Sequence, residues 1–572
     1  MSPRESRKFL NGPYFSDQKI YHRYVSYTTH NEEQTCMVAI VYQTDKRSGI
    51  TYAYQSISHW NREKKQSRAK RTLIGRVDIE TGEIIPTDGR NLQTLDDKVP
   101  VNSGPKTAVL AHRSFYGATY LLDAIGEKVG VTHDLKQCFP DTYRQILSIV
   151  YYLILEDSTP LYRFEKWGTL HKHPYGKKIT SQRSSELFAS ITEETKQKFF
   201  RLQGKRRCEQ EFWAYDTTSL SSYSETLKQV QYGFNKENDR LPQLNVTLVF
   251  GQESNLPFYY RKLVGNIPDV KTVHRLLEEL DILGYSKLKL VMDRGFYSEY
   301  NINDLYRNHV KFLISVKMSL AFVRKELDSI YDSFLNFEHY NEKYELYCKT
   351  VRTTWHYTQE RPYKEEILQE PRRLYIHYYY NIEKAADDKK AFDRRLIALK
   401  RELETGKPVP EHEKFYQKYF NSKTTPKRGT HVTVNEDIVS KAKRYFGFFS
   451  LITNETMDGA TALELYRNKD VVEKAFGNLK ERLNMRRALV SSEQSLDGKL
   501  FVQFVALIYI SYIKKQMQVN DLFKKFTLPG LLDKLDVIEC FEQPGRSLQV
   551  GEILEQQKRL YDDLGVNPPA SL

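Results

Sequence analysis

The sequence predicts an α/β fold, and the pattern of its middle third supports this in two ways. Apolar runs with the composition of strands occupy 245–250, 258–264 and 287–293, and a fourth strand is expected over 311–316. Apolar residues recur at helical spacing over 272–283, and a further helix is expected over 299–308, before the fourth strand. Strands that alternate with helices in this way are typical of a sheet covered by helices.

Two of the predicted strands end in an aspartate. Phe212-Trp-Ala-Tyr leads into Asp216, which is followed by Thr-Thr-Ser, and Leu288-Lys-Leu-Val-Met leads into Asp293, where Arg294 opens a turn. A rigid sheet can hold groups at strand ends in the geometry that catalysis needs. One such aspartate carries little weight, because aspartate also favours turns. Two of them, on strands able to pair, form a stronger pattern.

A third acidic residue, Glu473, lies in a segment with helical spacing that runs from Tyr466 to Lys480. At about 100° per residue, Glu473 and Lys480 share a face, and Tyr466 and Lys469 come close to it. The apolar residues expected to pack are Val472, Ala475, Phe476 and Leu479. A carboxylate between cations suits a metal-assisted phosphate site. The alternative is a solvated helix face, with Asp470 and Glu473 forming a capping box.

Three carboxylates gathered at one point repel one another, and they stay ionised only if divalent cations neutralise them. Oxygen ligands that leave positions open for water and phosphate favour Mg²⁺. Two such ions, about 3.5–4 Å apart, would hold the attacking and leaving oxygens of an in-line displacement. The acidic residues therefore predict metal-dependent phosphoryl transfer.

The overall charge of the chain predicts a polyanionic partner. Its 572 residues suffice for several domains, and they include 87 Lys and Arg against 73 Asp and Glu, a net charge of +14. Basic residues concentrate in 62–71, and those expected to contact phosphates are Lys64, Lys65, Arg68 and Arg71. The alternative is a solvated loop.

The remaining composition predicts a cytosolic protein without membrane association. Its five cysteines are scattered with no CxxC pair, which is typical of reduced, structural thiols and not of a zinc knuckle. The N-terminus lacks the apolar stretch of a signal peptide. The longest apolar run, 500–513, is too short to span a bilayer and predicts a buried core helix.

The three acidic motifs together resemble a known family. Ala214-Tyr-Asp-Thr-Thr-Ser-Leu-Ser-Ser-Tyr-Ser, Met292-Asp-Arg-Gly-Phe-Tyr-Ser and Tyr466-x2-Lys469-x3-Glu473-x6-Lys480 are similar to the motifs of bacterial DDE transposases that carry the Tyr-Arg-Glu-Lys signature. These form the insertion sequence four superfamily, and the chain resembles its long Asp-Thr-Thr-Ser branch over roughly 105–320 and 440–570. Lys469 stands where the signature has arginine, so a bidentate phosphate contact becomes a point charge. Arg467 is a nearby candidate to replace it.

The resemblance implies an RNase H-like catalytic core with a DDE triad of Asp216, Asp293 and Glu473, which holds Mg²⁺ or, as a substitute, Mn²⁺. It implies cut-and-paste transposition, with double-stranded DNA as partner: the terminal inverted repeats of the element and the target DNA. The residues expected to contact this DNA near the triad are Arg294, Tyr466, Lys469 and Lys480. Because joining requires both ends of the element to be held together, we expect a homodimer on DNA, at the nucleoid in the bacterial cytoplasm.

The spacing of the motifs predicts an insertion. Asp293 and Glu473 are 180 residues apart, against 77 between Asp216 and Asp293. The expected parts are a β-rich basic region over 1–100, a helical DNA-binding or dimerisation domain over 101–207, the core over 208–320 and 441–518, a mixed α+β insertion domain over 321–440, and a helical tail over 519–572. Some relatives use a tryptophan of the insertion to stack on a flipped base, and Trp355 is the candidate here. The alternative for Trp355 is an ordinary core aromatic.

Two other functions are consistent with the same residues. A transposase-derived protein could bind DNA without cutting it, although the presence of all three acidic residues favours activity. A stand-alone RNase H-like nuclease would share the metal site but would not join free 3′-hydroxyl ends to a second duplex.

Overall fold

The structure is a computed structural model, and it describes residues 38–61, 66–79, 81–86, 112–157, 159–206, 211–224, 227–233, 241–285, 287–361, 366–425, 429–483 and 492–570. The chain divides into two compact units, Met1–Pro105 and Lys106–Leu572. Each unit is described by itself below.

The first unit contains a four-stranded antiparallel sheet. Its strands are β1 (Val38–Thr44), β2 (Thr51–Asn61), β3 (Gln66–Val77) and β4 (Ile84–Ile85), paired in chain order. The expected hairpin between residues 72 and 85 is confirmed, since Val77 pairs with Ile84. The second half of the basic run belongs to β3 and is not a loop.

The second unit is built on a nine-stranded mixed sheet. In spatial order its strands are β11 (Tyr340–Asn341), β12 (Leu346–Arg361), β13 (Glu366–Tyr380), β16 (Phe448–Thr453), β10 (Lys311–Val316), β9 (Lys289–Met292), β6 (Trp213–Ser221), β7 (Gln243–Gly251) and β8 (Pro257–Val264). The short strand β9 pairs in parallel with β6 and with β10, and the other pairs are antiparallel. The predicted α/β organisation is therefore confirmed.

Helices connect the parallel strands. Helix α7 (Thr272–Ile282) lies between β8 and β9, and α8 (Glu299–Arg307) lies between β9 and β10. The apolar stripe of α7, with Val273, Leu276 and Leu280, is buried, which explains why this segment forms an amphipathic helix. The bounds of both helices agree with the sequence prediction to within one residue.

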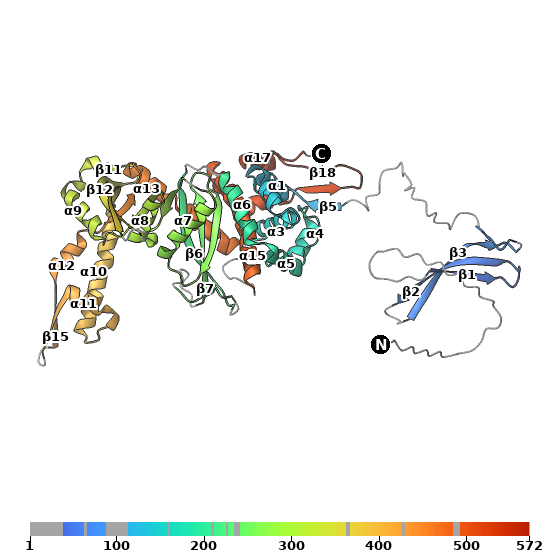
Figure 1. The fold of residues 1–572 in the computed structure, drawn as a ribbon, viewed down its shortest axis with the longest axis horizontal. Coiled ribbons are helices and arrows are strands. Elements are labelled where there is room, and N and C mark those ends of the chain that lie inside the picture. The colour runs from blue at the N-terminus through green and yellow to red at the C-terminus, as the bar shows by residue number, and fades with distance from the viewer. Residues whose placement is uncertain are drawn as a thin grey trace. The chain divides into compact units, whose positions relative to one another are not determined.

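A long helix, α15 (Glu493–Val519), forms the centre of the helical layer. It contacts α3 (Tyr143–Leu155), α5 (Ser181–Ser190) and strand β8, and Figure 1 shows it among the helices that precede β6. By length and composition α15 could cross a membrane, but 89% of its most apolar window is buried inside the protein. The prediction of a buried core helix at 500–513 is confirmed.

The other helices around α15 come from both ends of this unit. They are α1 (Gly117–Lys128), α2 (Val131–Cys138), α4 (Phe164–Leu170), α6 (Glu193–Lys205), α16 (Leu528–Asp536) and α17 (Glu555–Asp563). Besides its helices, the tail contributes β17 (Glu539–Glu542) and β18 (Gln549–Val550) to a small sheet with β5 (His112–Phe115). The Tyr561 hydroxyl donates to the carbonyl of Gly117 at 2.8 Å, so the tail packs against the first helix of the unit.

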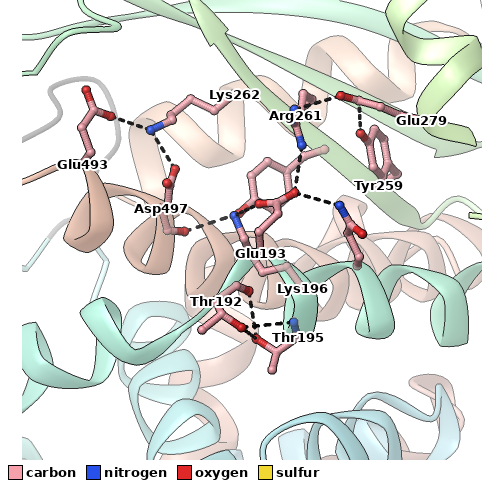
Figure 2. Close-up of polar contacts among 12 residues, drawn as sticks. Thr192, Glu193, Thr195, Lys196, Tyr259, Arg261, Lys262, Glu279, Glu493 and Asp497 are labelled. Carbon is pink, nitrogen blue, oxygen red and sulfur yellow. Dashed lines mark hydrogen bonds and ion pairs between the residues drawn. The ribbon is translucent and has the colours of Figure 1, made fainter. Parts of the chain in front are cut away.

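A network of ion pairs fixes the helical layer to edge strand β8 (Figure 2). The Lys262 ammonium, whose side chain is 8% exposed, lies 2.7 Å from Glu493 and 2.8 Å from Asp497 at the start of α15. The neighbouring Arg261 lies 2.8 Å from Glu193 of α6 and 3.1 Å from Glu279 of α7. Partly buried pairs of this kind fix orientation, because breaking one leaves a charge without its partner.

The predicted insertion, residues 321–440, has two parts. Strands β11, β12 and β13 extend the central sheet, with α9 (Ala321–Phe334) packed on β12. A smaller body follows, made of α10 (Ile382–Glu404), α11 (Glu413–Tyr419), β14 (Phe420–Thr425), β15 (Gly429–Val434) and α12 (Glu436–Lys443). It has its own hydrophobic cluster, which includes Leu399, Tyr416 and Val432.

Candidate active site

Asp216 lies within strand β6 and not at its end, so the sequence prediction was wrong on this point. The strand continues to Ser221 because Asp216 and the residues after it pair with β7, from Leu248 to Gln243. Threonines at 217 and 218 also suit a strand, and both are buried. Asp216 is the one residue of β6 that is not fully buried.

The neighbouring strand β9 ends at this level of the sheet. Its parallel pairing with β6 stops at Tyr215 and Met292, and Asp293 directly follows. Asp216 and Asp293 therefore each follow a residue of the last pair between these adjacent strands, and the backbones of adjacent strands lie about 4.8 Å apart. The expectation that the two aspartates come from neighbouring strands is confirmed.

Both aspartates line a cavity of about 1190 Å³. Glu473, Arg294 and Lys480 line the same cavity. Residues that are 77 and 180 positions apart in the chain thus meet at one place, together with two cations.

Glu473 does not lie on one continuous helix from Tyr466 to Lys480, as the sequence had suggested. Helix α13 (Gly459–Arg467) ends there, α14 (Asp470–Gly477) begins after Lys469, and residues Asn478–Arg482 form a π-helical turn. The junction is closed by tight bonds between residues three apart, such as the Val472 amide to the Lys469 carbonyl at 3.0 Å. The capping box is absent, because Lys469 is the N-cap residue and its side chain forms no cap bond.

The break lets the Lys469 side chain turn inward to the acidic residues. Lys469 is 4% exposed, and its ammonium donates to Glu473 Oε1 at 3.0 Å. Burial opposes its charge, but the bond to Glu473 and the negative charges of Asp216 and Asp293 outweigh burial, so the pKa of Lys469 is raised. Lys469 is therefore a counter-ion shared by all three carboxylates.

Tyr466 fixes Asp293. Its hydroxyl donates to Asp293 Oδ1 at 2.7 Å, and the backbone N–H of Arg294 donates to the same oxygen at 2.8 Å. Burial raises the pKa of Asp293, but these two bonds and the nearby charges of Lys469 and Arg294 outweigh it, so the net pKa is lowered. The pKa of Tyr466 is raised, first by burial and then by the charge of Asp293. Asp293 is thus held as a carboxylate.

Three charged cavity residues were not predicted from the sequence: Asp269, Lys317 and Glu481. Asp269 adds a fourth carboxylate to the lining and accepts a hydrogen bond from the Thr217 hydroxyl. Lys317 adds a further cation and directly follows strand β10. Asp293 was predicted because it directly follows a strand, and Lys317 directly follows a strand too, so the same signal could have identified it. Asp269, in a loop after Pro268, carried no such signal.

The family model described as "Transposase DDE domain" matches residues 198–509, more than half of the chain. The chain belongs to the transposase DDE domain family. No curated protein matches the chain. A solved structure of the piggyBac transposase synaptic complex with hairpin DNA resembles it at 11% identity, over 72% of this chain and 70% of that one, with a TM-score of 0.32. At this distance the likeness does not establish a shared fold.

Transposase DDE domains generally use divalent metal ions, and the donor chemistry of the cavity fits such an ion. Asp216, Asp293 and Glu473 line it beside two further acidic residues, and carboxylate oxygens are the ligands that hard divalent cations prefer. Among the described residues, however, no three acidic, histidine or cysteine side chains are close enough to hold a metal ion. The ligands are partly engaged by Lys469 and Tyr466, while Glu473 keeps a side chain that is 59% exposed. The site has the right donors but is not preassembled.

The other residues predicted to contact DNA do not line the catalytic cavity. Lys64 and Lys65 fall outside the described residues, and Arg68 and Arg71 are exposed on β3 of the first unit. Trp355 is 8% exposed on β12, and its indole N–H donates to Asn303 Oδ1 at 2.8 Å. It presents no free ring face, so base stacking, which stays a prediction, would require its release.

Arg467, considered as a replacement for the signature arginine, does not line the cavity. Its guanidinium lies over the Tyr344 ring, 4.9 Å from the ring centre. Lys469 does not line the cavity either, but its ammonium bonds Glu473, and the charges of Asp216 and Asp293 act on it.

Proposed function

We propose that the chain is an active transposase that cleaves DNA at the ends of a mobile element and joins the freed ends to target DNA, with Mg²⁺ as cofactor or Mn²⁺ as a substitute. The observation that carries the proposal is the meeting of Asp216, Asp293 and Glu473 at one cavity, from three distant segments. Family membership supplies the reaction class. A DNA-binding protein that had lost cleavage would have no need to keep all three carboxylates at one site.

We also propose that the strands around this site form an RNase H-like core. The order β8-β7-β6-β9-β10 places three antiparallel strands beside two parallel ones, with Asp216 on the central strand of the five. Asp293 follows the next strand, and Glu473 comes from a helix that packs on β6 and β7. This arrangement supports the core that the motif resemblance implies.

The side chains in and beside the cavity divide into metal-binding, DNA-binding and positioning groups. Divalent ions at the three carboxylates would supply Lewis-acid chemistry, activating the attacking oxygen and stabilising charge on the phosphate. Arg294 and Lys480 would hold phosphates that flank the scissile bond. Tyr466 holds Asp293 in place, and the Lys469 ammonium reduces the repulsion among the carboxylates until the ions arrive.

Joining two ends of one element requires two active sites, so we propose a homodimer on DNA. The basic face of β3, with Arg68 and Arg71, would contact the backbone of the element ends. The number of chains per pair of ends, measured by light scattering on the purified complex, tests this assembly.

The deciding experiment uses duplex DNA from the borders of the element. Wild-type protein should cleave it in Mg²⁺ and join the 3′-hydroxyl ends to a second duplex, whereas Asp216→Asn, Asp293→Asn and Glu473→Gln should bind it but not cleave. Glu464→Gln, an exposed glutamate on α13 outside the cavity, is the matched control and should cleave normally. Cleavage without joining would indicate a nuclease, and binding without cleavage by the wild type would indicate a DNA-binding protein.

A further inference from the structure

A second cavity, of about 290 Å³, lies on another face of the catalytic helix. Helix α14 and the turn after it present Glu473, Phe476 and Lys480 to the catalytic cavity. Lys474 and Asn478, four residues apart and therefore on one helix face, line the second cavity. Its opposite wall comes from α15 and includes Lys514.

The second cavity is lined by two lysines and by no acidic residue. The Lys514 ammonium donates to Asn478 Oδ1 at 2.6 Å, a neutral acceptor. Within the described part of the chain, neither Lys474 nor Lys514 forms an ion pair with a carboxylate. Arg482 stands nearby and is paired with Asp157 at 3.6 Å. Positive charge therefore gathers here without matching negative charge.

The repulsion among these positive charges is unfavourable in the protein without a bound anion. The pKa of Lys514 is lowered, first by burial and then by the positive charges of Arg482 and Lys474. Like charges in a partly buried site repel one another, and a bound anion would remove that cost. The other lining groups, the Asn255 amide, the Ser511 hydroxyl and the Gln518 amide, can donate hydrogen bonds to anion oxygens.

We propose that Lys474 and Lys514 form a binding site for a backbone phosphate of DNA, separate from the catalytic cavity. Its volume of about 290 Å³ gives a phosphate group ample room between the two ammonium groups. The proposal rests on the DNA-binding function of the transposase and is independent of its metal chemistry. A phosphate held on this face would fix the orientation of α14, which carries Glu473 into the catalytic cavity.

The test measures the affinity of the full-length protein for duplex DNA over a series of salt concentrations, without divalent metal. Each phosphate contact adds about 0.9 to the slope of log affinity against log salt. Lys514→Met and, independently, Lys474→Gln should each lower the slope by up to this amount, while Lys514→Arg should keep it. Lys534→Gln, an exposed helical lysine on α16, is the matched control for Lys474→Gln and should leave the slope unchanged.

A second measurement distinguishes DNA from free phosphate. The thermal midpoints of wild type and Lys514→Met are compared with and without inorganic phosphate, which also shows that the variant folds. Unchanged slopes in both Lys514→Met and Lys474→Gln would overturn the proposal. If phosphate raised the midpoint of the wild type alone while the DNA slopes stayed equal, the site would take free phosphate and the assignment to DNA would be wrong. If the wild type proved unable to cleave DNA, the salt slopes of DNA binding could still be compared. The phosphate site and the proposed cleavage activity are therefore tested separately.

Discussion

Replacing Lys469 with methionine should destabilise the metal-free protein and strengthen its binding of divalent metal. Lys469 is 4% exposed and donates to Glu473, and it is the shared counter-ion of Asp216 and Asp293. Methionine has a similar length and is apolar, so it keeps most of the packing while it removes the positive charge. Three carboxylates would then lie close together without the buried ammonium, and the remaining cations would be Arg294, Lys317 and Lys480 of the cavity lining.

The expected cost follows from the exposure of the partners. Removing one member of a fully buried pair costs about 3–5 kcal/mol, because the other charge stays buried. Here the Glu473 side chain is 59% exposed and can turn to water, and Asp293 keeps its bonds from Tyr466 and from the Arg294 N–H. We therefore expect a loss of about 1–3 kcal/mol in the free energy of unfolding in EDTA.

Magnesium should reverse this loss. The ammonium and the metal ion compete for the same carboxylates, so its removal should lower the dissociation constant for Mg²⁺. A ligand at 100 times its dissociation constant stabilises the folded state by about 2.7 kcal/mol, which is enough to offset the substitution. The assay is urea unfolding of wild type and Lys469→Met, in EDTA and in a series of Mg²⁺ concentrations.

Two outcomes would refute this reasoning. If Lys469→Met were as stable as the wild type in EDTA, the carboxylates would not need the ammonium. If Mg²⁺ stabilised both proteins equally, the lysine and the metal would not share a site. Lys469→Arg keeps the charge and should behave like the wild type in EDTA, so it separates loss of charge from loss of shape.

Three further outcomes are expected. Lys480→Ala should slow DNA cleavage by orders of magnitude without weakening Mg²⁺ binding, because Lys480 lines the cavity as a phosphate contact; equal rates would contradict this role. Tyr466→Phe should raise the pKa of Asp293, which the tyrosine hydroxyl helps to lower, so the acid limb of the pH–rate profile of cleavage should move to higher pH. The lowered pKa of Asp293 in the wild type stabilises the folded state above the unfolded-state pKa near 3.8. This stability is lost as the pH falls through the pKa of the folded state. Lys262→Met should cost about 2 kcal/mol of unfolding free energy, since it leaves Glu493 and Asp497 without their cation, whereas Lys524→Met in an exposed pair should cost under about 0.5 kcal/mol by the same urea titration.

Local sequence patterns predicted the elements of the core better than its pairing. The strands over 258–264 and 311–316 and the helix over 272–283 were found within one residue. The strands are short apolar runs with consecutive buried residues, and the helix carries an apolar stripe at helical spacing. The continuation of β6 past Asp216 was missed, since it depends on β7 as a partner, some thirty residues away. Likewise, nothing local shows that β12 and β13 join the central sheet and extend it beyond β16.

The candidate site shows the same division between what is local and what depends on the fold. The spacing from Glu473 to Lys480 placed both residues at the cavity correctly, although a π-helical turn replaces the end of the expected helix. The break before α14 could not be predicted, because no proline or glycine causes it. It coincides with the inward turn of Lys469, whose attraction to Asp216 and Asp293 exists only once the sheet has brought them together.

The geometry of α14 also explains why this helix lines two cavities. A helix that begins at a buried lysine presents Glu473 to the catalytic cavity, and the residue after it, about 100° further round, faces away from that cavity. Lys474 is therefore placed against α15 by the same geometry that places Glu473 against the aspartates. A phosphate bound at Lys474 and a metal bound at Glu473 would act on one short rigid element, so each should favour the helix orientation that the other requires.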